Sequence, residues 1–259
     1  MKGKKMGRIV AVSNQKGGVG KTSTCINLAA GIAKKGKKVL IIDMDAQGNA
    51  TTGLGIGKSS IRASAYNVLI GSTTAREAII ETKVKNLDIL PSSIDLAGAE
   101  VELVTQSRRE KRLATAIRDL KEHYDYIFID CPPAIGLLTI NALAAADGVL
   151  IPIQSEYYAL EGLSQLMNTV KLVKKALNPA LSIDGVVITM YDGRALISRQ
   201  IREEITKFFG DKVFKTVIPR NIRVSEAPSY GVPVIEHDKN CRGTLGYLAL
   251  TEEFLSRSL

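Results

Sequence analysis

The chain of 259 residues is strongly basic, and its composition excludes several classes of protein. Thirty-five Lys and Arg residues against 26 Asp and Glu give a formal net charge of +9, which favours a polyanionic partner such as nucleic acid. Three cysteines, odd in number and widely spaced, exclude a disulfide framework and favour a reducing, cytoplasmic location. Residues 1–7 are basic and lead into an interrupted apolar run, so we expect a flexible tail rather than a signal peptide or a membrane span.

Apolar runs alternate with helical patterns along the whole chain. The runs predict strands at 8–14, 39–43, 87–90, 126–130, 149–153, 185–189 and 213–217. Helical spacing of apolar residues predicts helices at 23–35, 113–122, 137–146, 160–177, 197–209 and 244–256. Several strands are apolar at nearly every position, which predicts a mostly parallel twisted sheet covered by helices on both faces. No linker divides the chain, so we expect one α/β domain over 1–259, with a mobile Gly- and Ser-rich loop at 53–60.

A glycine-rich loop lies between the first strand and the first helix. Its sequence is Lys16-Gly17-Gly18-Val19-Gly20-Lys21-Thr22, followed by Ser23. The glycines can turn consecutive N–H groups inward and form a concave anion site at the start of a helix. We expect Lys21 to bind the β- and γ-phosphates of ATP and the Thr22 hydroxyl to bind Mg²⁺. This loop makes the fold that of a P-loop NTPase.

Lys16 departs from the standard pattern of such a loop, because Gln15 occupies the position five residues before Gly20. A second ammonium group is redundant at its own phosphates. Pointing outward, it could reach the phosphates of a nucleotide in a facing subunit. The sequence therefore predicts a nucleotide-dependent homodimer.

Aspartates end two of the predicted strands. Asp43 and Asp45 follow one apolar run, and Asp130 ends another immediately before two prolines. Parallel strands place their carboxyl ends at one edge of the sheet, so these carboxylates are expected beside the phosphate loop. We assign Asp130 to the Mg²⁺ shell and Asp45 to the attacking water, since phosphoryl transfer depends mainly on positioning and charge neutralisation. For Asp43 the sequence leaves two roles open, one in the chemistry of the site and one in supporting the turn.

These motifs together resemble the deviant Walker A ATPases, specifically the ParA-type chromosome and plasmid partition proteins with their Soj branch. Segments 154–162, 189–194 and 217–223 also resemble that branch, so the similarity covers nearly the whole chain. The resemblance implies an ATP-dependent sandwich dimer that binds DNA without sequence preference at the nucleoid. It also implies a ParB-type partner that stimulates ATP hydrolysis.

Carried over residue by residue, the resemblance gives Lys16 the role of the lysine that acts across the dimer. It implies that Pro219 and Asn221 contact the adenine. Three arginines would line the DNA face, namely Arg194, Arg220 and Arg223. All three are expected in loops that follow strands, where a guanidinium group is available for phosphate.

Two alternative functions share this fold. A MinD-type ATPase cycles on and off the membrane by a C-terminal amphipathic helix, but residues 244–259 lack a basic, aromatic membrane face, so stable membrane association is not expected. A metabolic ligase-like enzyme, such as dethiobiotin synthetase, is the other alternative, because a fold does not determine a function.

Overall fold

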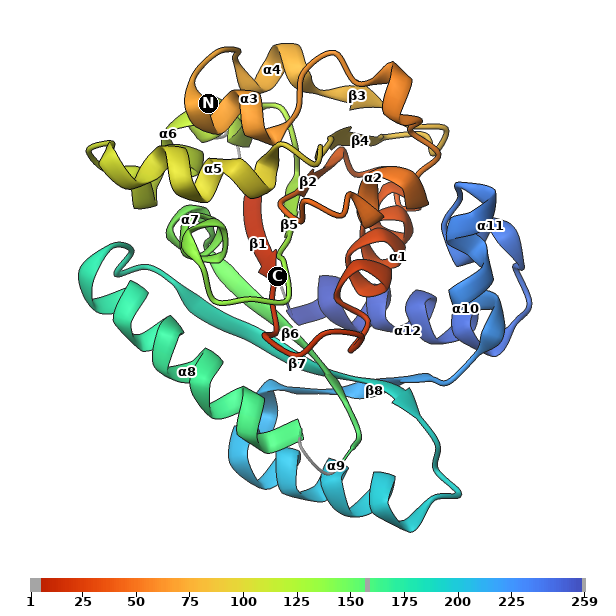
Figure 1. Cartoon of the computed structure of the whole chain (residues 1–259). Helices are drawn as coiled ribbons and strands as arrows, with labels where there is room; N and C mark the ends of the chain where they lie inside the picture. The colour runs from red at the N-terminus through yellow and green to blue at the C-terminus, as the bar shows by residue number, and fades with distance from the viewer. Residues whose placement is uncertain (1–5, 157–158, 258–259) are drawn as a thin grey trace, which may run out of the picture.

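An eight-stranded sheet forms the centre of the computed structural model, which describes residues 6–156 and 159–257 (Figure 1). The strand order is β3-β4-β2-β5-β1-β6-β7-β8, and every neighbouring pair is parallel except β3 with β4. The strands are β1 (Arg8–Val12), β2 (Val39–Asp43), β3 (Ile80–Glu81), β4 (Leu87–Leu90), β5 (Tyr126–Asp130), β6 (Gly148–Gln154), β7 (Ser182–Tyr191) and β8 (Val213–Pro219). The predicted fold class is confirmed.

Helices cover both faces of the sheet because its strands present apolar side chains on both sides, which gives two cores. One face packs against α3 (Ala65–Ile70), α4 (Ala75–Ala78), α5 (Leu96–Glu102), α6 (Arg112–Ala116), α7 (Leu137–Ala145), α8 (Ala159–Ala176) and α9 (Leu196–Phe209). The other packs against α1 (Lys21–Lys34), α2 (Asn49–Gly53), α10 (Ile222–Glu226), α11 (Val234–His237) and α12 (Arg242–Arg257). Within the described residues, no helix is both long and apolar enough to cross a membrane.

The strands follow the predicted order, but some shorter elements were not predicted. The strand expected at 185–189 extends over Ser182–Tyr191, and the short edge strand β3 was missed. The helix expected at 113–122 is broken at Ile117 into α6 and a 3₁₀ turn at Arg118–Glu122. Residues 1–5 of the predicted tail, and Tyr157 and Tyr158 of the segment used for the resemblance, lie outside the described residues.

The loop expected to be mobile at 53–60 is partly packed, so that expectation was wrong for its first half. Gly53 ends α2 and Leu54 is buried. Gly55, with φ of 78°, lies so close to Gly231 that an added Cβ would come within 2.9 Å of the Gly231 carbonyl oxygen. The glycines here permit a close approach of two backbones rather than flexibility.

The order in which strands are added to the sheet changes from one side of β1 to the other. The candidate site lies at this point. From β1 it passes through α1 to β2 on one side, and β6 later pairs with the other side of β1. Crevices for ligands form where strand order reverses, outside the carboxyl ends of parallel strands. Residues 13–20, between β1 and α1, occupy this position.

Candidate functional site

The loop between β1 and α1 presents unpaired backbone donors. Gly18 and Gly20 have φ of 74° and 84°, in the left-handed region that glycine adopts without strain. Within the described residues, the backbone N–H groups of Gly17, Gly18, Val19 and Gly20 donate to no acceptor, and no side chain caps the start of α1. Free N–H groups at the N-terminus of a 14-residue helix attract an anion through their partial charges.

Lys21 closes this loop. Its Nζ donates a 3.0 Å hydrogen bond to the carbonyl oxygen of Lys16, and the residue is only 7% exposed. Burial lowers the pKa of Lys21, while the charge of Asp130 opposes that shift. The ammonium group is therefore held at the loop, next to the free N–H groups, where an anion would meet it.

Asp130 ends β5 and is completely buried. Neither of its carboxylate oxygens has a hydrogen-bond partner among the described residues. Burial, and next the charge of Asp43, raise the pKa of Asp130 well above its usual range, whereas the nearby Thr22 hydroxyl and Lys21 lower it. Buried polar groups almost always have partners, so an orphaned carboxylate beside a hydroxyl fits a cation ligand. Thr22 and Asp130 thus provide oxygen atoms of the kind Mg²⁺ prefers.

Asp43 supports the turn after β2. Its Oδ2 accepts hydrogen bonds from the Thr51 N–H at 2.9 Å and the Thr51 hydroxyl at 2.7 Å, and its Oδ1 accepts from the Asp45 N–H at 3.2 Å. Burial raises the pKa of Asp43 to about 6 although the bonds from Thr51 lower it. The half-buried Asp45 accepts a bond from the Gln47 N–H at 3.0 Å. This geometry gives Asp43 the supporting role, and the role of Asp45 stays a prediction.

Lys16 forms an ion pair within its own chain. Its Nζ lies 2.9 Å from Oε2 of Glu156, and the two side chains are 34% and 48% exposed. Glu156 follows the end of β6, so the pair joins two loops at the same edge of the sheet. The action of Lys16 across a dimer stays a prediction.

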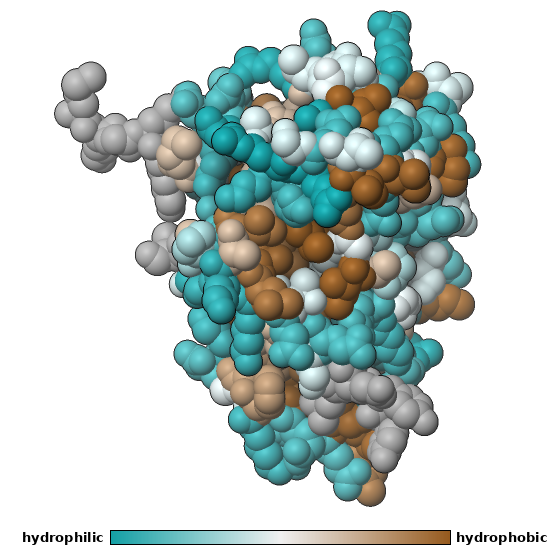
Figure 2. All heavy atoms as spheres, turned by 60° about the vertical axis from the view of Figure 1, so that its left-hand side comes forward, coloured by the Kyte–Doolittle hydropathy of each residue, from teal (hydrophilic) through white to brown (hydrophobic). Residues whose placement is uncertain are grey.

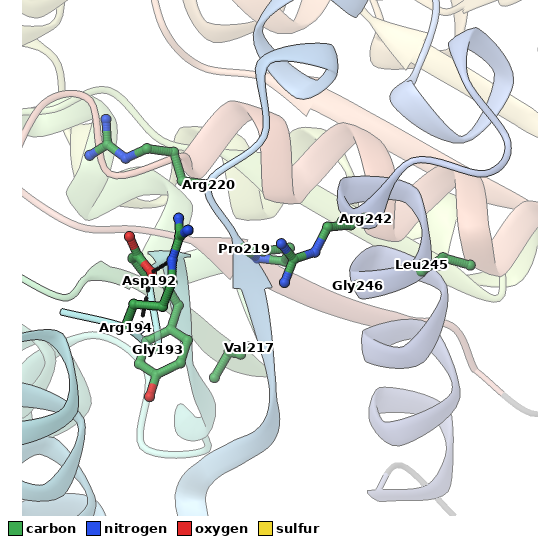
Figure 3. Close-up of a pocket in the computed structure, with 10 residues that line it drawn as sticks. Asp192, Gly193, Arg194, Val217, Pro219, Arg220, Arg242, Leu245 and Gly246 are labelled. Atoms are coloured by element: carbon green, nitrogen blue, oxygen red, sulfur yellow. Dashed lines mark hydrogen bonds and ion pairs between the residues drawn. The ribbon is translucent and has the colours of Figure 1, made fainter.

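A hollow of about 680 Å³ lies at this edge near β7 and β8, and we call it the arginine pocket (Figure 3). Its three arginines come from separate elements: Arg194 from the loop after β7, Arg220 from the end of β8, and Arg242 from the start of α12. Its other lining residues are Tyr191, Asp192, Gly193, Val217, Pro219, Leu245 and Gly246. The side chain of Arg194 is 92% exposed and pairs with Asp192 at 3.3 Å.

The structure brings together only two of the three arginines predicted for DNA. Arg223 does not line the arginine pocket and instead pairs with Glu226 at 2.8 Å and Asp238 at 3.6 Å. Arg242 was missed because it begins a helix instead of following a strand, and no local signal in the sequence brings it to β8.

The two residues predicted to contact adenine have different surroundings. Pro219 lines the arginine pocket, whereas the Asn221 side chain caps α10 by accepting a hydrogen bond from the Arg223 N–H at 3.0 Å. Both lie at the carboxyl end of β8. Their contacts with adenine stay predictions.

Comparison with known proteins agrees with this geometry. A family described as "AAA domain" matches residues 7–183. The sporulation initiation inhibitor protein Soj of Bacillus subtilis is 56% identical over 96% of this chain and 98% of its own, and the chromosome partitioning protein ParA of Myxococcus xanthus is 52% identical over 97% and 89%. The crystal structure of cobyrinic acid a,c-diamide synthase from Mycobacterium smegmatis, with bound ADP and magnesium, is 34% identical, with a TM-score of 0.84 over 95% of this chain and 93% of that one.

The sheet is mostly parallel, a phosphate loop follows its first strand, and a buried aspartate ends a neighbouring strand. These features together define a P-loop nucleotide-binding protein. More narrowly, the chain belongs to the AAA-domain family and, within it, to the Soj and ParA chromosome partitioning proteins.

Proposed function

We propose that this chain is an ATP-dependent partition ATPase that pairs with a second copy, binds DNA without sequence preference and hydrolyses ATP with a ParB-type partner. Such a protein acts in the cytoplasm on the nucleoid. The main support for the proposal is the buried carboxylate of Asp130, which has no hydrogen-bond partner among the described residues. It lies near Lys21 and the loop whose N–H groups are free. Sequence similarity to Soj and ParA along nearly the whole chain supports a role in chromosome partitioning.

ATP and Mg²⁺ are the ligands that the nucleotide site supports best. The M. smegmatis synthase of the same fold binds ADP and magnesium. In this chain, residues 17–23 would bind the phosphates, Lys21 would neutralise their charge, and Thr22 with Asp130 would hold Mg²⁺. Bound Mg²⁺ would offset the phosphate charge during hydrolysis. Asp45 would orient the attacking water.

DNA is the partner that the arginine pocket supports best. The formal charge of the whole chain is +9, and Arg194, Arg220 and Arg242 are all exposed. Guanidinium groups bind phosphate oxygens well but read no base sequence unless they reach a groove edge. Because one chain contributes only three arginines to the pocket, two paired chains would hold DNA much more firmly than one.

DNA retention over a salt series tests the proposal. Wild type, Arg194→Glu, Arg220→Glu and Arg242→Glu are compared on two unrelated duplexes, with and without a non-hydrolysed ATP analogue. We expect wild type to bind only with the analogue and to bind both duplexes equally. Each pocket variant should bind more weakly and lose about one unit of salt slope per lost phosphate contact. Lys85→Glu is the matched control, because Lys85 is exposed before β4, away from the arginine pocket.

The alternatives give different outcomes. Binding of wild type to anionic vesicles instead of DNA would favour a MinD-type cycle. However, α12 buries Tyr247, Leu250 and Phe254 against the sheet, so its apolar face is already occupied. Phosphate release that needs a small substrate and ignores DNA would favour a ligase-like enzyme, the class suggested by the synthase of the same fold.

A further inference from the structure

Thr189, near the end of β7, touches the phosphate loop from the neighbouring strand. The residue is 2% exposed, and its hydroxyl donates a 2.7 Å hydrogen bond to the carbonyl oxygen of Val19. Its Cβ and Cγ2 lie 3.8 Å from the position that a Cβ on Gly20 would occupy. A side chain 170 residues away in the sequence therefore fixes one peptide group of the loop.

That peptide group also carries a donor of the anion site. The carbonyl of Val19 and the N–H of Gly20 belong to one planar trans unit, so they point in opposite directions. Because the carbonyl is held toward β7, the Gly20 N–H is turned away from β7. Glycine has wide backbone freedom, and Gly20 is already left-handed with φ of 84°, so without the Thr189 hydroxyl this peptide could rotate.

The same strand end leads directly to the arginine pocket. Met190 follows Thr189 with φ of 51°, which is an uncommon, strained conformation for a residue other than glycine. Tyr191 comes next, and its carbonyl accepts a hydrogen bond from the Arg220 N–H at 3.4 Å. Tyr191 also lines the pocket with Arg194. A single residue, Met190, therefore separates a contact with the phosphate loop from a contact with the pocket.

We propose that Thr189 is a positioning residue that orients the Gly20 N–H toward the phosphates of the nucleotide. It also couples nucleotide binding at the loop to ligand binding at the arginine pocket. Because the Thr189 hydroxyl is bonded to the Val19 carbonyl, a shift of this peptide when phosphates bind would move Thr189 as well. Any change at Thr189 reaches Tyr191 through the strained Met190. The second half of this proposal rests on the proposed binding of DNA at the pocket.

Nucleotide affinity tests the first half. Thr189→Val keeps the shape of the side chain and removes the donor, which leaves the Val19 carbonyl unpaired. We expect the affinity for ADP and for a non-hydrolysed ATP analogue to fall about tenfold, which is the usual effect of one lost hydrogen bond. Thr189→Ser, which keeps the hydroxyl, should bind like wild type. Unchanged affinity in a folded Thr189→Val protein would overturn the proposal.

A matched control separates positioning from general damage. The buried Thr251 hydroxyl also donates to a backbone carbonyl, that of Tyr247 at 2.8 Å, but in α12, away from the loop. Thr251→Val should melt at a lower temperature and bind nucleotide normally. If Thr189→Val does not fold, Thr189→Cys keeps a weak donor of similar size and should show a smaller loss of affinity. Wild-type affinity in Thr189→Cys together with a folding defect in Thr189→Val would also count against the proposal.

The coupling to DNA is tested separately. The measured quantity is the ratio of DNA affinity with a saturating ATP analogue to DNA affinity without it. We expect this ratio to fall at least about fivefold in Thr189→Val, within the usual range of coupling between two sites. An unchanged ratio would refute the link. If the ATP analogue did not raise the DNA affinity of wild type, the proposed function would fail. The nucleotide experiment would still decide the role of Thr189 in the loop.

Discussion

Two buried aspartates lie side by side where β2 and β5 end. Asp43 and Asp130 are direct partners in the parallel register, and burial raises the pKa of both. The pKa of Asp43 rises to about 6 in the folded chain, whereas an unfolded aspartate titrates near about 4. Because the pKa of Asp43 is higher in the folded chain, protonation of Asp43 stabilises the fold. This contribution to the free energy of unfolding is complete below about pH 4 and is lost as the pH rises through about 6. At neutral pH this contribution of Asp43 is therefore absent.

Asp130→Asn should stabilise the nucleotide-free protein at neutral pH, by about 1–3 kcal/mol, because burial and the charge of Asp43 disfavour an ionised carboxylate at this position. Its melting temperature should depend less on pH between about 4 and 7 than that of wild type. The additional stabilisation that a nucleotide gives in the presence of Mg²⁺ should disappear. Thermal melts over pH, with and without Mg²⁺ and an ATP analogue, measure all three effects.

Asp43→Asn is the control for this experiment. It should destabilise the fold, because Asp43 accepts three hydrogen bonds that an amide cannot accept equally. A lower melting temperature for Asp130→Asn, with Mg²⁺-dependent stabilisation intact, would remove Asp130 from the metal site.

Asp45→Ala should separate binding from hydrolysis. The change spares the free N–H groups and Lys21, so nucleotide affinity should stay within about twofold of wild type. Phosphate release in a single turnover should slow at least about a hundredfold if Asp45 orients or deprotonates the water. Turnover at the wild-type rate would show that another group acts on the water.

Helices α1 and α12 pack so closely that a glycine is required between them. A Cβ on Gly31 would overlap the side-chain hydroxyl oxygen of Thr251, whereas a Cβ on Gly98 in α5 would meet nothing closer than 3.6 Å. Neither glycine has positive φ. The two residues therefore provide a matched pair within helices, one at a close contact and one exposed.

Gly31→Ala should lower the free energy of unfolding by about 1–3 kcal/mol, because overpacking outweighs the gain in helix propensity. Gly98→Ala should raise it by about 0.5–1 kcal/mol, because only the propensity changes. Denaturant unfolding of both variants gives the comparison. Equal effects of the same sign would mean that α1 and α12 are not packed as the structure has them.

Sequence patterns predicted the long elements and missed the short ones for a physical reason. Helices such as α9 span several turns, so their apolar spacing is visible, whereas α2 and α4 have only 5 and 4 residues. The phosphate loop, Asp130 and Arg220 were selected as candidates because local signals mark strand ends. Arg242 and Thr189 were not, since their roles depend on contacts with residues more than 20 and 160 positions away, respectively.

The phosphate loop and the arginine pocket lie at one edge of a single sheet, and apolar side chains are exposed on another part of the surface. Figure 2 turns forward the side of the molecule that carries α5 and α7, and apolar side chains gather near its middle. Val101 in α5 and Val104 in the following 3₁₀ turn are exposed by 76% and 56%. Apolar surface of this kind favours association with another protein chain. The predicted homodimer, in which Lys16 would reach the partner, needs an exposed surface of this kind.

Three variants test this assembly by sizing with a non-hydrolysed ATP analogue. Lys21→Ala should remain a monomer because it loses the nucleotide. Lys16→Ala should bind nucleotide like wild type and still pair poorly, since the charge that acts across the interface is gone. Glu156→Gln should pair more strongly, because it frees Lys16 from its ion pair.

The size of the last effect follows from exposure. The Lys16–Glu156 pair is largely open to solvent, so it is worth at most about 1 kcal/mol in each chain. Since a homodimer contains two such pairs, the dimerisation constant should rise by no more than about thirtyfold. Double substitution of Lys16 by Ala and Glu156 by Gln should behave like Lys16→Ala alone, because the gain depends on a free lysine. Wild-type pairing by Lys16→Ala would show that this lysine acts only within its own chain, where the ion pair with Glu156 would then be its whole role.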